Sequence, residues 1–514
     1  MNPIIRQLTT LLIVILSIAK VQAQAVRWSK IEGSDEKARL IIMADMGNEP
    51  DEQQQMMHLL LYSNEFDLEG LLAVTGKYLG PHMSNPKQQR LYPELFDELI
   101  DGYAKVYKSL KKHDSNYPTP DYLHSIVAAG QSGYGSESIG ESMQSDGSNL
   151  LVKVFERDDP RPIVIIVNAG SNTLAQALFD YGNKYGDKAT KRVTKRLRVI
   201  ENGAQDDSGA YICHNYPDIY WVRSNYQAYC YGGPMGNSRL KDGSDIHKNQ
   251  LGPYTWEPYE YSALGQHQWA LEHIIGNHGA FGAYWPLRQF GNGAISFVEG
   301  GGTVPWLCTI NRGLSHINNL DWGGWSGRYG REKMENYMSK HESVEKDEHR
   351  YKPFMMYGEE VDSWVDPETG ELYENLYTAV WRWRRALFND FKYRMDWCNS
   401  SVEDTNHNPT VVIDGDESRS ILTAKIKSGS TITIDASESF DTDGDTLYFS
   451  WYNYKEAGNF CGEIEIKDAD KPKIMIDIPL DAKGSELHII LELRDNLLHK
   501  DAAFSYRRLL IECN

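Results

Sequence analysis

The sequence lacks two features that mark large classes of proteins. No apolar run reaches the roughly 18 residues that a membrane-spanning helix needs, which excludes a polytopic membrane protein. Positive charge is also scarce, because 53 Lys and Arg residues stand against 72 Asp and Glu residues, for a net charge of −19. A surface with that balance repels a phosphate backbone, so we expect no nucleic-acid partner. Hydrophobic residues still make up 41% of the 514, enough for roughly two to four packed domains.

Cysteine is rare as well, with six residues in the whole chain and no CxxC pair. This spacing disfavours zinc and thioredoxin-type sites. Cys461 and Cys513 share the C-terminal region and could form a disulfide, which an exported protein would permit. Buried free thiols are the alternative for the other four residues, which are Cys213, Cys230, Cys308 and Cys398.

The first residues have the pattern of a secretory signal peptide. Arg6 gives a positive start, and Leu11–Ala19 is a short apolar stretch. Val21–Ala23 offers a small-residue cleavage site, and Ala23–Ala25 is an alternative one. A membrane anchor is less consistent with the sequence, because the apolar stretch is short and Lys20 interrupts it. We therefore expect a secreted or periplasmic protein.

Short apolar runs alternate with helix-like segments through most of the chain. Arg39–Ala44, Leu68–Thr75 and Pro162–Val167 are continuous apolar runs, as are the shorter Arg196–Ile200 and Ile219–Val222. Continuous rather than alternating apolar strands, separated by helices, predict a mainly parallel α/β sheet with flanking helices. Ligands of such sheets bind beyond the carboxyl ends of the strands.

The pattern of apolar and polar residues changes after a polar linker at Ser400–Pro409. Thr431–Asp435 and Leu447–Trp451 alternate apolar and polar residues, and the DTDGD sequence between them is typical of a turn. About 100 residues of this kind predict a small all-β, immunoglobulin-like sandwich. The predicted organisation is a signal peptide at 1–23, an α/β domain at 24–400 and a β-sandwich at 401–514.

An acidic loop directly after the first apolar run is the strongest functional signal. Asp45, Asn48, Glu49, Asp51 and Glu52 place four carboxylates and an amide within eight residues. Crowded carboxylates raise one another's pKa, a cost that a Ca²⁺ ion or a general-base role would offset. A helix N-terminus that collects acidic residues is the alternative. It explains Asp51 and Glu52 well and Asp45 poorly, because Asp45 ends the strand.

Polar side chains also follow two later strands. They are Asn168, Ser171, Asn172 and Thr173 after one strand, and Asp206 and Asp207 after the next. Amides and hydroxyls at a strand end suit sugar hydroxyls, although a helix cap and a surface turn are the alternatives. The region from 279 to 329 is rich in Gly, Trp and Asn, which is typical of loops that wall a cleft or cap a core.

Several motifs in one order resemble the Sde182-type proteins. They are the acidic loop, GSNTLAQAL, QDDSG, EGGGTVPWL, WGGWSGRY, WRWRRALFNDF and TIDASESFDTDGDTLYFSWYNYKEAG. That family is described as cellulose-binding, with a nucleoside-hydrolase-like N-terminal domain and a C-terminal β-domain. The resemblance covers nearly the whole mature chain and implies the same fold here.

The resemblance also implies roles for the acidic loop. In nucleoside hydrolases such a loop binds one Ca²⁺ and the sugar hydroxyls, and an aspartate activates the attacking water. Asp45, Asp51 and Glu52 match three of its acids, whereas Gly47 stands where the acid that acts as base is expected. Glu49 could reach the same space. The late motif of the family, EGDTPSF, is matched by Glu299–Pro305 without its aspartate.

These observations predict an exported hydrolase of glycosidic bonds that acts on a carbohydrate or glycoside, with a nucleoside as the less favoured substrate. Glu49 and Asp45 are the predicted catalytic residues, with Glu49 as general base. Asp45, Asp51 and Glu52 are the predicted Ca²⁺ ligands.

Six further residues are predicted to contact the substrate. Asn48, Asn172 and Asp206 would orient the sugar, and Trp306, Trp322 and Trp325 would offer stacking surfaces. The alternative function is a non-catalytic protein that binds cellulose or another polysaccharide through a degenerate nucleoside-hydrolase fold. The absence of the second acid and of the late aspartate favours this alternative. A scaffold for other exported proteins is a third reading, which no motif supports specifically.

Overall fold

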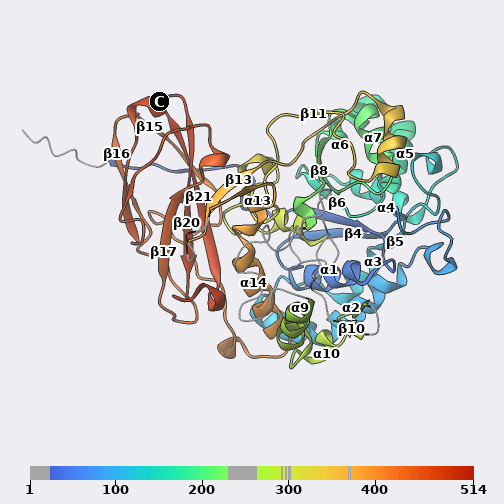
Figure 1. Ribbon diagram of the computed structural model, residues 1–514, viewed down its shortest axis with the longest axis horizontal. Coiled ribbons are helices and arrows are strands. Elements are labelled where there is room, and N and C mark those ends of the chain that lie inside the picture. Colours follow the sequence, from blue (N-terminus) through green and yellow to red (C-terminus); the bar gives the residue numbers. More distant parts are fainter. Residues whose placement is uncertain are drawn as a thin grey trace, which may run out of the picture.

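The apolar runs of the first domain form one sheet of six parallel strands in the described residues, in the order β5-β4-β3-β6-β7-β8. The strands are β3 (Arg39–Ala44), β4 (Asp67–Ala73), β5 (Val127–Ala129), β6 (Ile163–Val167), β7 (Leu197–Asn202) and β8 (Tyr220–Ser224). This computed structural model describes residues 24–229, 263–290, 293–295, 298, 302–367, 370 and 372–514. The predicted α/β fold with a C-terminal β-domain is confirmed (Figure 1).

Helices cover both faces of the parallel sheet, which is why strands such as β3 and β6 bury apolar residues on both faces. Leu40 and Ile42 of β3 belong to a core on one face, and Ile41 and Met43 belong to a core on the other. The first core includes α1 (Pro50–Leu61), α2 (Glu94–His113), α3 (Pro120–Ser125) and α14 (Arg384–Asp396). The second includes α4 (Asp146–Phe155), α5 (Asn172–Tyr185), α6 (Asp187–Thr194) and α7 (Ser208–Asn215).

The strand order places a topological switch point between β3 and β6. From β3 the chain proceeds outward through β4 and β5, then returns to β6 on the other side of β3. The loops after β3 and β6 therefore lead apart, and ligands of such sheets bind in the crevice between them. Asp45 follows β3 and Asn168 follows β6, so the switch point brings together two of the predicted polar segments.

The C-terminal domain is a sandwich of two sheets, seen at the left of Figure 1. One sheet has the order β17-β20-β21-β15-β2, and the other β1-β16-β19-β18. The C-terminal strands are β15 (Leu422–Ile426), β16 (Thr431–Asp435), β17 (Tyr448–Asn453), β18 (Ile466–Lys467), β19 (Lys473–Asp477), β20 (Glu486–Arg494) and β21 (Phe504–Cys513). The first two strands of the described chain, β1 (Gln24–Ala25) and β2 (Ser29–Lys30), pair with β16 and β15. Residues at the start of the described chain thus complete the C-terminal sandwich.

The aromatic segment before the linker forms two helices rather than one. Residues 376–397 are helical by period and composition, but α13 (Thr378–Trp381) ends before α14 begins at Arg384. The intervening Arg382 guanidinium binds Asp362 with an N–O distance of 3.2 Å and lies over the ring of Tyr454, 4.1 Å from its centroid. The break therefore coincides with a contact between the two domains, because Tyr454 belongs to the sandwich.

The predicted disulfide is absent from the described residues. Cys461 is an exposed free thiol, whereas Cys513 ends β21 and faces the sandwich core. Cys213, Cys308 and Cys398 are buried free thiols, as the alternative reading expected, and Cys230 lies outside the described residues. Among the helices that the structure describes, none is long and apolar enough to span a bilayer.

Candidate functional site

Asp45 lies at the carboxyl end of β3 and is completely buried. Neither carboxylate oxygen meets an N–H donor or a hydroxyl in the described part of the chain, although Asp45 lies close enough to Glu52 for the two carboxyls to share a proton. Burial, and then the negative charge of Asp51, raise the pKa of Asp45 to about 7. A buried carboxyl that titrates near neutral pH is typical of functional sites.

The other acids of the loop divide into buried and exposed groups. Asp51 and Glu52 lie in the first turn of α1, where the helix dipole favours negative charge. Burial and the charges of Asp51 and Asp45 raise the pKa of Glu52 well above its usual value. Glu49 is exposed at the N-cap of α1 and adds a smaller repulsion to Asp45. The structure thus couples Asp45, Asp51 and Glu52 closely and leaves Glu49 at the rim.

Gly47 occupies a position that no acidic side chain can fill without rearrangement. Its φ of +90° lies in the region that favours glycine. A Cβ atom built there would lie 2.9 Å from a ring carbon of Tyr92 and 3.1 Å from the Leu95 side chain. The space that the nucleoside-hydrolase base would need is therefore taken by Tyr92.

Two amides bridge the switch point beside the acidic loop. Asn168, which follows β6, donates from Nδ2 to Oε1 of Gln55 on α1 at 2.8 Å. Gln205 donates from Nε2 to the backbone carbonyl of Asn168 at 3.0 Å. A Cβ atom built at Gly302 would lie 1.8 Å from Oε1 of Gln55, so the Gln55 amide fills the space beside the Gly302 backbone. The Oδ1 atom of Asn168 is buried and meets no donor among the described residues.

Asp206 is a second buried carboxyl at the same edge of the sheet. Its Oδ1 accepts hydrogen bonds from the backbone N–H groups of Ser208 at 2.9 Å and Ser171 at 3.2 Å. Its Oδ2 meets no donor in the described part of the chain. Burial, and then the charge of Asp207, raise the pKa of Asp206 to about 7. Asp45 and Asp206 therefore share the two features expected of acid–base groups, which are burial and a pKa near neutrality.

The two predicted sugar-binding amides have structural partners. Asn172 begins α5 and donates from Nδ2 to Gly133 O at 2.8 Å, to Ser138 Oγ at 3.0 Å and to Thr75 Oγ1 at 3.1 Å. These bonds tie the loops after β4 and β5 to α5. Asn48 accepts a hydrogen bond from Gln88 at 3.2 Å.

The described residues do not by themselves fit calcium. Ca²⁺ needs six to eight oxygen ligands. No group of three or more His, Cys, Asp or Glu side chains in the described ranges is arranged to hold a metal ion. Gly47 stands where the resemblance places a further acid, and Glu299 and the two glycines after it lie outside the described residues. We therefore derive no chemical step through a metal.

The predicted stacking role of three tryptophans is corrected by the structure. Trp306, Trp322 and Trp325 are only 1%, 7% and 2% exposed. The Trp306 ring packs edge-on against His58, with 5.2 Å between centroids, and the Trp322 ring stacks on His316. These side chains build the core beneath the glycine-rich loops and offer no open face to a ligand.

Gln55 is the main member of the site that the sequence did not single out. It lies on α1 three residues after Glu52, and so on nearly the same face of the helix. The sequence could have indicated Gln55 through this three-residue spacing from Glu52, which was already assigned to the site.

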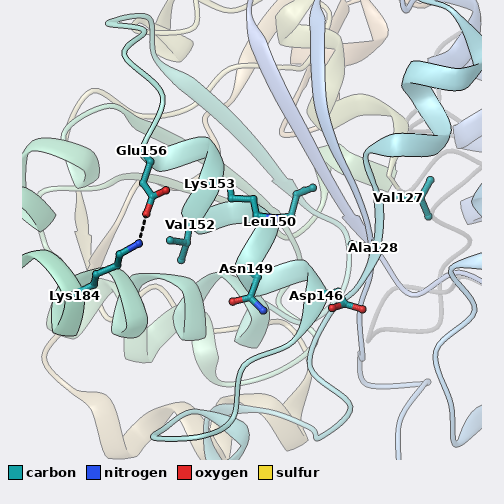
Figure 2. A pocket seen from close by; sticks show the side chains of 9 residues that line it. All are labelled: Val127, Ala128, Asp146, Asn149, Leu150, Val152, Lys153, Glu156 and Lys184. Carbon is teal, nitrogen blue, oxygen red and sulfur yellow. Dashed lines mark hydrogen bonds and ion pairs between the residues drawn. The ribbon is translucent and has the colours of Figure 1, made fainter.

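A pocket of about 610 Å³ lies elsewhere, beside edge strand β5. Figure 2 shows it lined by nine residues of β5, α4 and α5, none of which belongs to the predicted site. The pair between Lys184 and Glu156, at 2.8 Å, crosses its rim and is solvent-exposed. Exposed pairs of this kind contribute little to stability or recognition.

Comparisons with known proteins agree with this fold. The family model for the nucleoside hydrolase-like domain of cellulose-binding Sde182 matches residues 39–329, and the model for the C-terminal domain of cellulose-binding protein Sde0182 matches residues 431–513. A solved structure of a nucleoside hydrolase-related hypothetical protein from Saccharophagus degradans, described as associated with carbohydrate metabolism, is 29% identical. The match covers 93% of this chain and 100% of that one, with a TM-score of 0.75.

Two further comparisons add no argument. The effector protein XOO4466 is 12% identical over 63% of this chain and 87% of its own, and its TM-score of 0.28 is too low to indicate a shared fold. No curated protein matches the chain.

Proposed function

The chain belongs to the Sde182 family of nucleoside hydrolase-like proteins, and from this premise we propose that it is an exported hydrolase of glycosidic bonds. The substrate class is a carbohydrate or glycoside, with a nucleoside as the less favoured case. The family descriptions and the carbohydrate association of the similar solved structure support this class. Export rests on the signal-peptide pattern at residues 1–23.

The observation that carries the proposal is the buried, donor-poor carboxyl of Asp45 at the switch point. With a pKa near 7, about half of the Asp45 carboxyls are ionised at neutral pH. Such a group can accept a proton from water in the transition state and later release it, which is the usual requirement of a general base. We assign Asp45 as the base that activates water for attack on the anomeric carbon.

Two neighbouring groups complete the proposed site. The Oδ2 atom of Asp206 and the Oδ1 atom of Asn168 are buried and meet no donor in the described residues, so a sugar hydroxyl that reached them would satisfy an unpaired acceptor. Glu49, exposed at the start of α1, is the second candidate for the base.

A non-catalytic polysaccharide-binding protein is the second candidate function. It is favoured by Gly47, because Tyr92 blocks the place where the related hydrolases carry an acid, and by the missing aspartate of the late motif. Both candidate functions require a carbohydrate ligand, but only the hydrolase would cleave it.

The experiment that separates them is a screen of the purified chain against p-nitrophenyl glycosides, nucleosides and soluble glycans. The proposal predicts release of a reducing sugar from at least one substrate. Measurable glycan affinity without turnover on any member of the panel would favour the binding protein.

A further inference from the structure

A second pocket of about 760 Å³ lies at the junction of the two domains. One side is built by β13 (Asp362–Val365) with α13 and the start of α14, and the other by β17, β20 and β21 of the sandwich. Its volume falls in the range of about 300–1,000 Å³ that is usual for small-molecule sites, which often lie between domains. None of the residues assigned to the sheet-edge site lines it.

The walls of the pocket are fixed by a buried ionic centre. Asp362, completely buried, accepts hydrogen bonds from Arg328 Nε at 2.6 Å and from the Tyr454 hydroxyl at 2.6 Å. It also binds Arg382 at 3.2 Å. The backbone N–H of Ser363 donates to Glu456 Oε1 of the sandwich at 3.1 Å. These contacts join the two domains, so the pocket is preformed rather than a gap between loosely placed units.

The lining combines aromatic rings with balanced charge. The rings belong to Trp364, Trp381, Tyr452, Phe504 and Tyr506. Three cations and three carboxylates also line it, namely Arg382, Arg385, Lys455, Glu456, Glu463 and Glu492. Burial lowers the pKa of His499, which also lines the pocket, to about 3, so this ring is neutral at physiological pH. The pocket therefore has no net charge with which to select an ion.

Several charged groups of the lining form ion pairs with one another. Lys455 binds Glu463 at 2.7 Å, and Arg382 lies 3.7 Å from Glu456. Such pairs leave N–H and carboxylate edges that can each bond a hydroxyl. A polar ligand with many hydroxyls matches this lining better than an ion does.

Two of the five rings present an accessible surface to the pocket. Trp364 and Tyr452 are half-buried, whereas Trp381, Phe504 and Tyr506 are at most 4% exposed. Indole and phenol rings pack well against the apolar C–H faces of sugar rings.

We propose that this junction pocket binds a neutral oligosaccharide at a place separate from the carboxyl cluster of the parallel sheet. The faces of Trp364 and Tyr452 would pack on the sugar rings, while the paired charges of the lining would bond the hydroxyls. The proposal shares with the proposed function the class of ligand, a carbohydrate, and does not depend on catalysis at Asp45.

The test is calorimetric titration of the intact chain with cello-, xylo- and manno-oligosaccharides. Wild-type protein should bind at least one of them saturably. Trp364→Ala removes a half-buried ring from the pocket, and Ser450→Trp fills it from β17. Each should weaken binding by about tenfold or more, which corresponds to roughly 1.4 kcal/mol. Phe440→Ala, which removes an exposed ring of the sandwich outside the pocket, should leave the affinity unchanged.

One more variant distinguishes this proposal from the proposed function. Asp45→Asn should retain the oligosaccharide affinity even if it abolishes turnover. Each variant is accepted only with a cooperative unfolding transition, so that misfolding is not read as lost binding. The proposal is overturned if wild-type protein binds none of the oligosaccharides. It is also overturned if affinity survives both pocket variants, or is lost in Asp45→Asn instead.

Discussion

At the scale of single residues, Asp45 and Asp206 each lower the stability of the folded chain when their carboxyls are ionised. Both carboxyls are buried, and burial raises the pKa of each to about 7. One pKa unit corresponds to about 1.4 kcal/mol, so an ionised Asp45 opposes folding by a few kcal/mol. These two carboxyls therefore lower the stability of the folded chain at the edge of the sheet where we propose that the site lies.

This cost predicts a pH dependence of stability. Between pH values of about 4 and about 7 the folded chain holds a proton on Asp45 that the unfolded chain releases, so stability falls as pH rises through this window. Asp45→Asn should therefore raise the unfolding midpoint at pH 8 and leave it nearly unchanged at pH 4. Asp218→Asn, at an exposed aspartate before β8, is the control and should shift neither value. Equal stability of Asp45→Asn and wild type at pH 8 would show that the Asp45 carboxyl is solvated.

The sequence predicted which residues carry charge here but not which are buried. Asp45 follows a continuous apolar strand, so its place at the sheet edge could be predicted. The exposure of Glu49 depends on α1 beginning at Pro50, one residue later. The burial of Trp306, Trp322 and Trp325 depends on loops that fold back on the core, which local composition does not encode.

At the scale of elements, the turn between β3 and α1 depends on a glycine. Gly47 combines a φ of +90° with contact distances that leave no room for a Cβ beside Tyr92. Nearby, Asn48 N–H donates to Asp45 O at 3.2 Å and closes the turn that directs the acidic loop.

Gly47→Ala should destabilise the chain by more than the roughly 1–2 kcal/mol of a left-handed residue alone. Gly444→Ala is a matched control, because Gly444 has a φ of +88° and no described atom within 4 Å of an added Cβ. Chemical denaturation of both variants measures the difference. Equal losses for the two would mean that Tyr92 moves aside freely, and that an acid could be accommodated at position 47.

Strands with continuous or alternating apolar residues were predicted to within a few residues of their ends. Pro162–Val167 corresponds to β6, and Thr431–Asp435 is β16 itself. β21 was not predicted, because Arg507 and Arg508 interrupt its pattern. Both arginines are buried, and Arg508 donates to the carbonyls of Leu314 and Gly323 in the other domain. Contacts between the domains thus explain the buried position of Arg508, which the residue pattern of β21 alone does not predict.

At the scale of the whole molecule, noncovalent contacts join the domains. Arg394 of α14 binds Glu65 at 2.7 Å, and Arg419 beyond the linker binds the same carboxylate at 3.0 Å. The pairing of β1 and β2 with the sandwich joins residues that are distant in the sequence, for example Gln24 and Ile432. Such long-range pairing cannot be predicted from local patterns.

The free thiols predict a reactivity pattern. Exposed Cys461 should react rapidly with iodoacetamide in the native protein. Buried Cys513, whose pKa burial raises to about 11, should react only after unfolding. Peptide mass mapping measures both, and dithiothreitol should not change the unfolding midpoint. Protection of Cys461 that is lost on reduction would reveal a disulfide.

Metal removal tests the calcium expectation. Because the described residues do not form a calcium site, EDTA and millimolar Ca²⁺ should leave the unfolding midpoint unchanged. A ligand at 100 times its Kd would stabilise the chain by about 2.7 kcal/mol. An increase of that size in the free energy of unfolding on addition of Ca²⁺ would indicate a calcium site completed by residues such as Glu299.

The most direct measurement of the central claim is kcat for wild type, Asp45→Asn and Asp218→Asn on the best substrate of the screen, near pH 7. If Asp45 is the general base, Asp45→Asn should lower kcat by about 10²–10⁴-fold, the usual contribution of a positioned base. Asp218→Asn should retain wild-type kcat. A folded Asp45→Asn protein with undiminished kcat would contradict the assignment of Asp45 as the base.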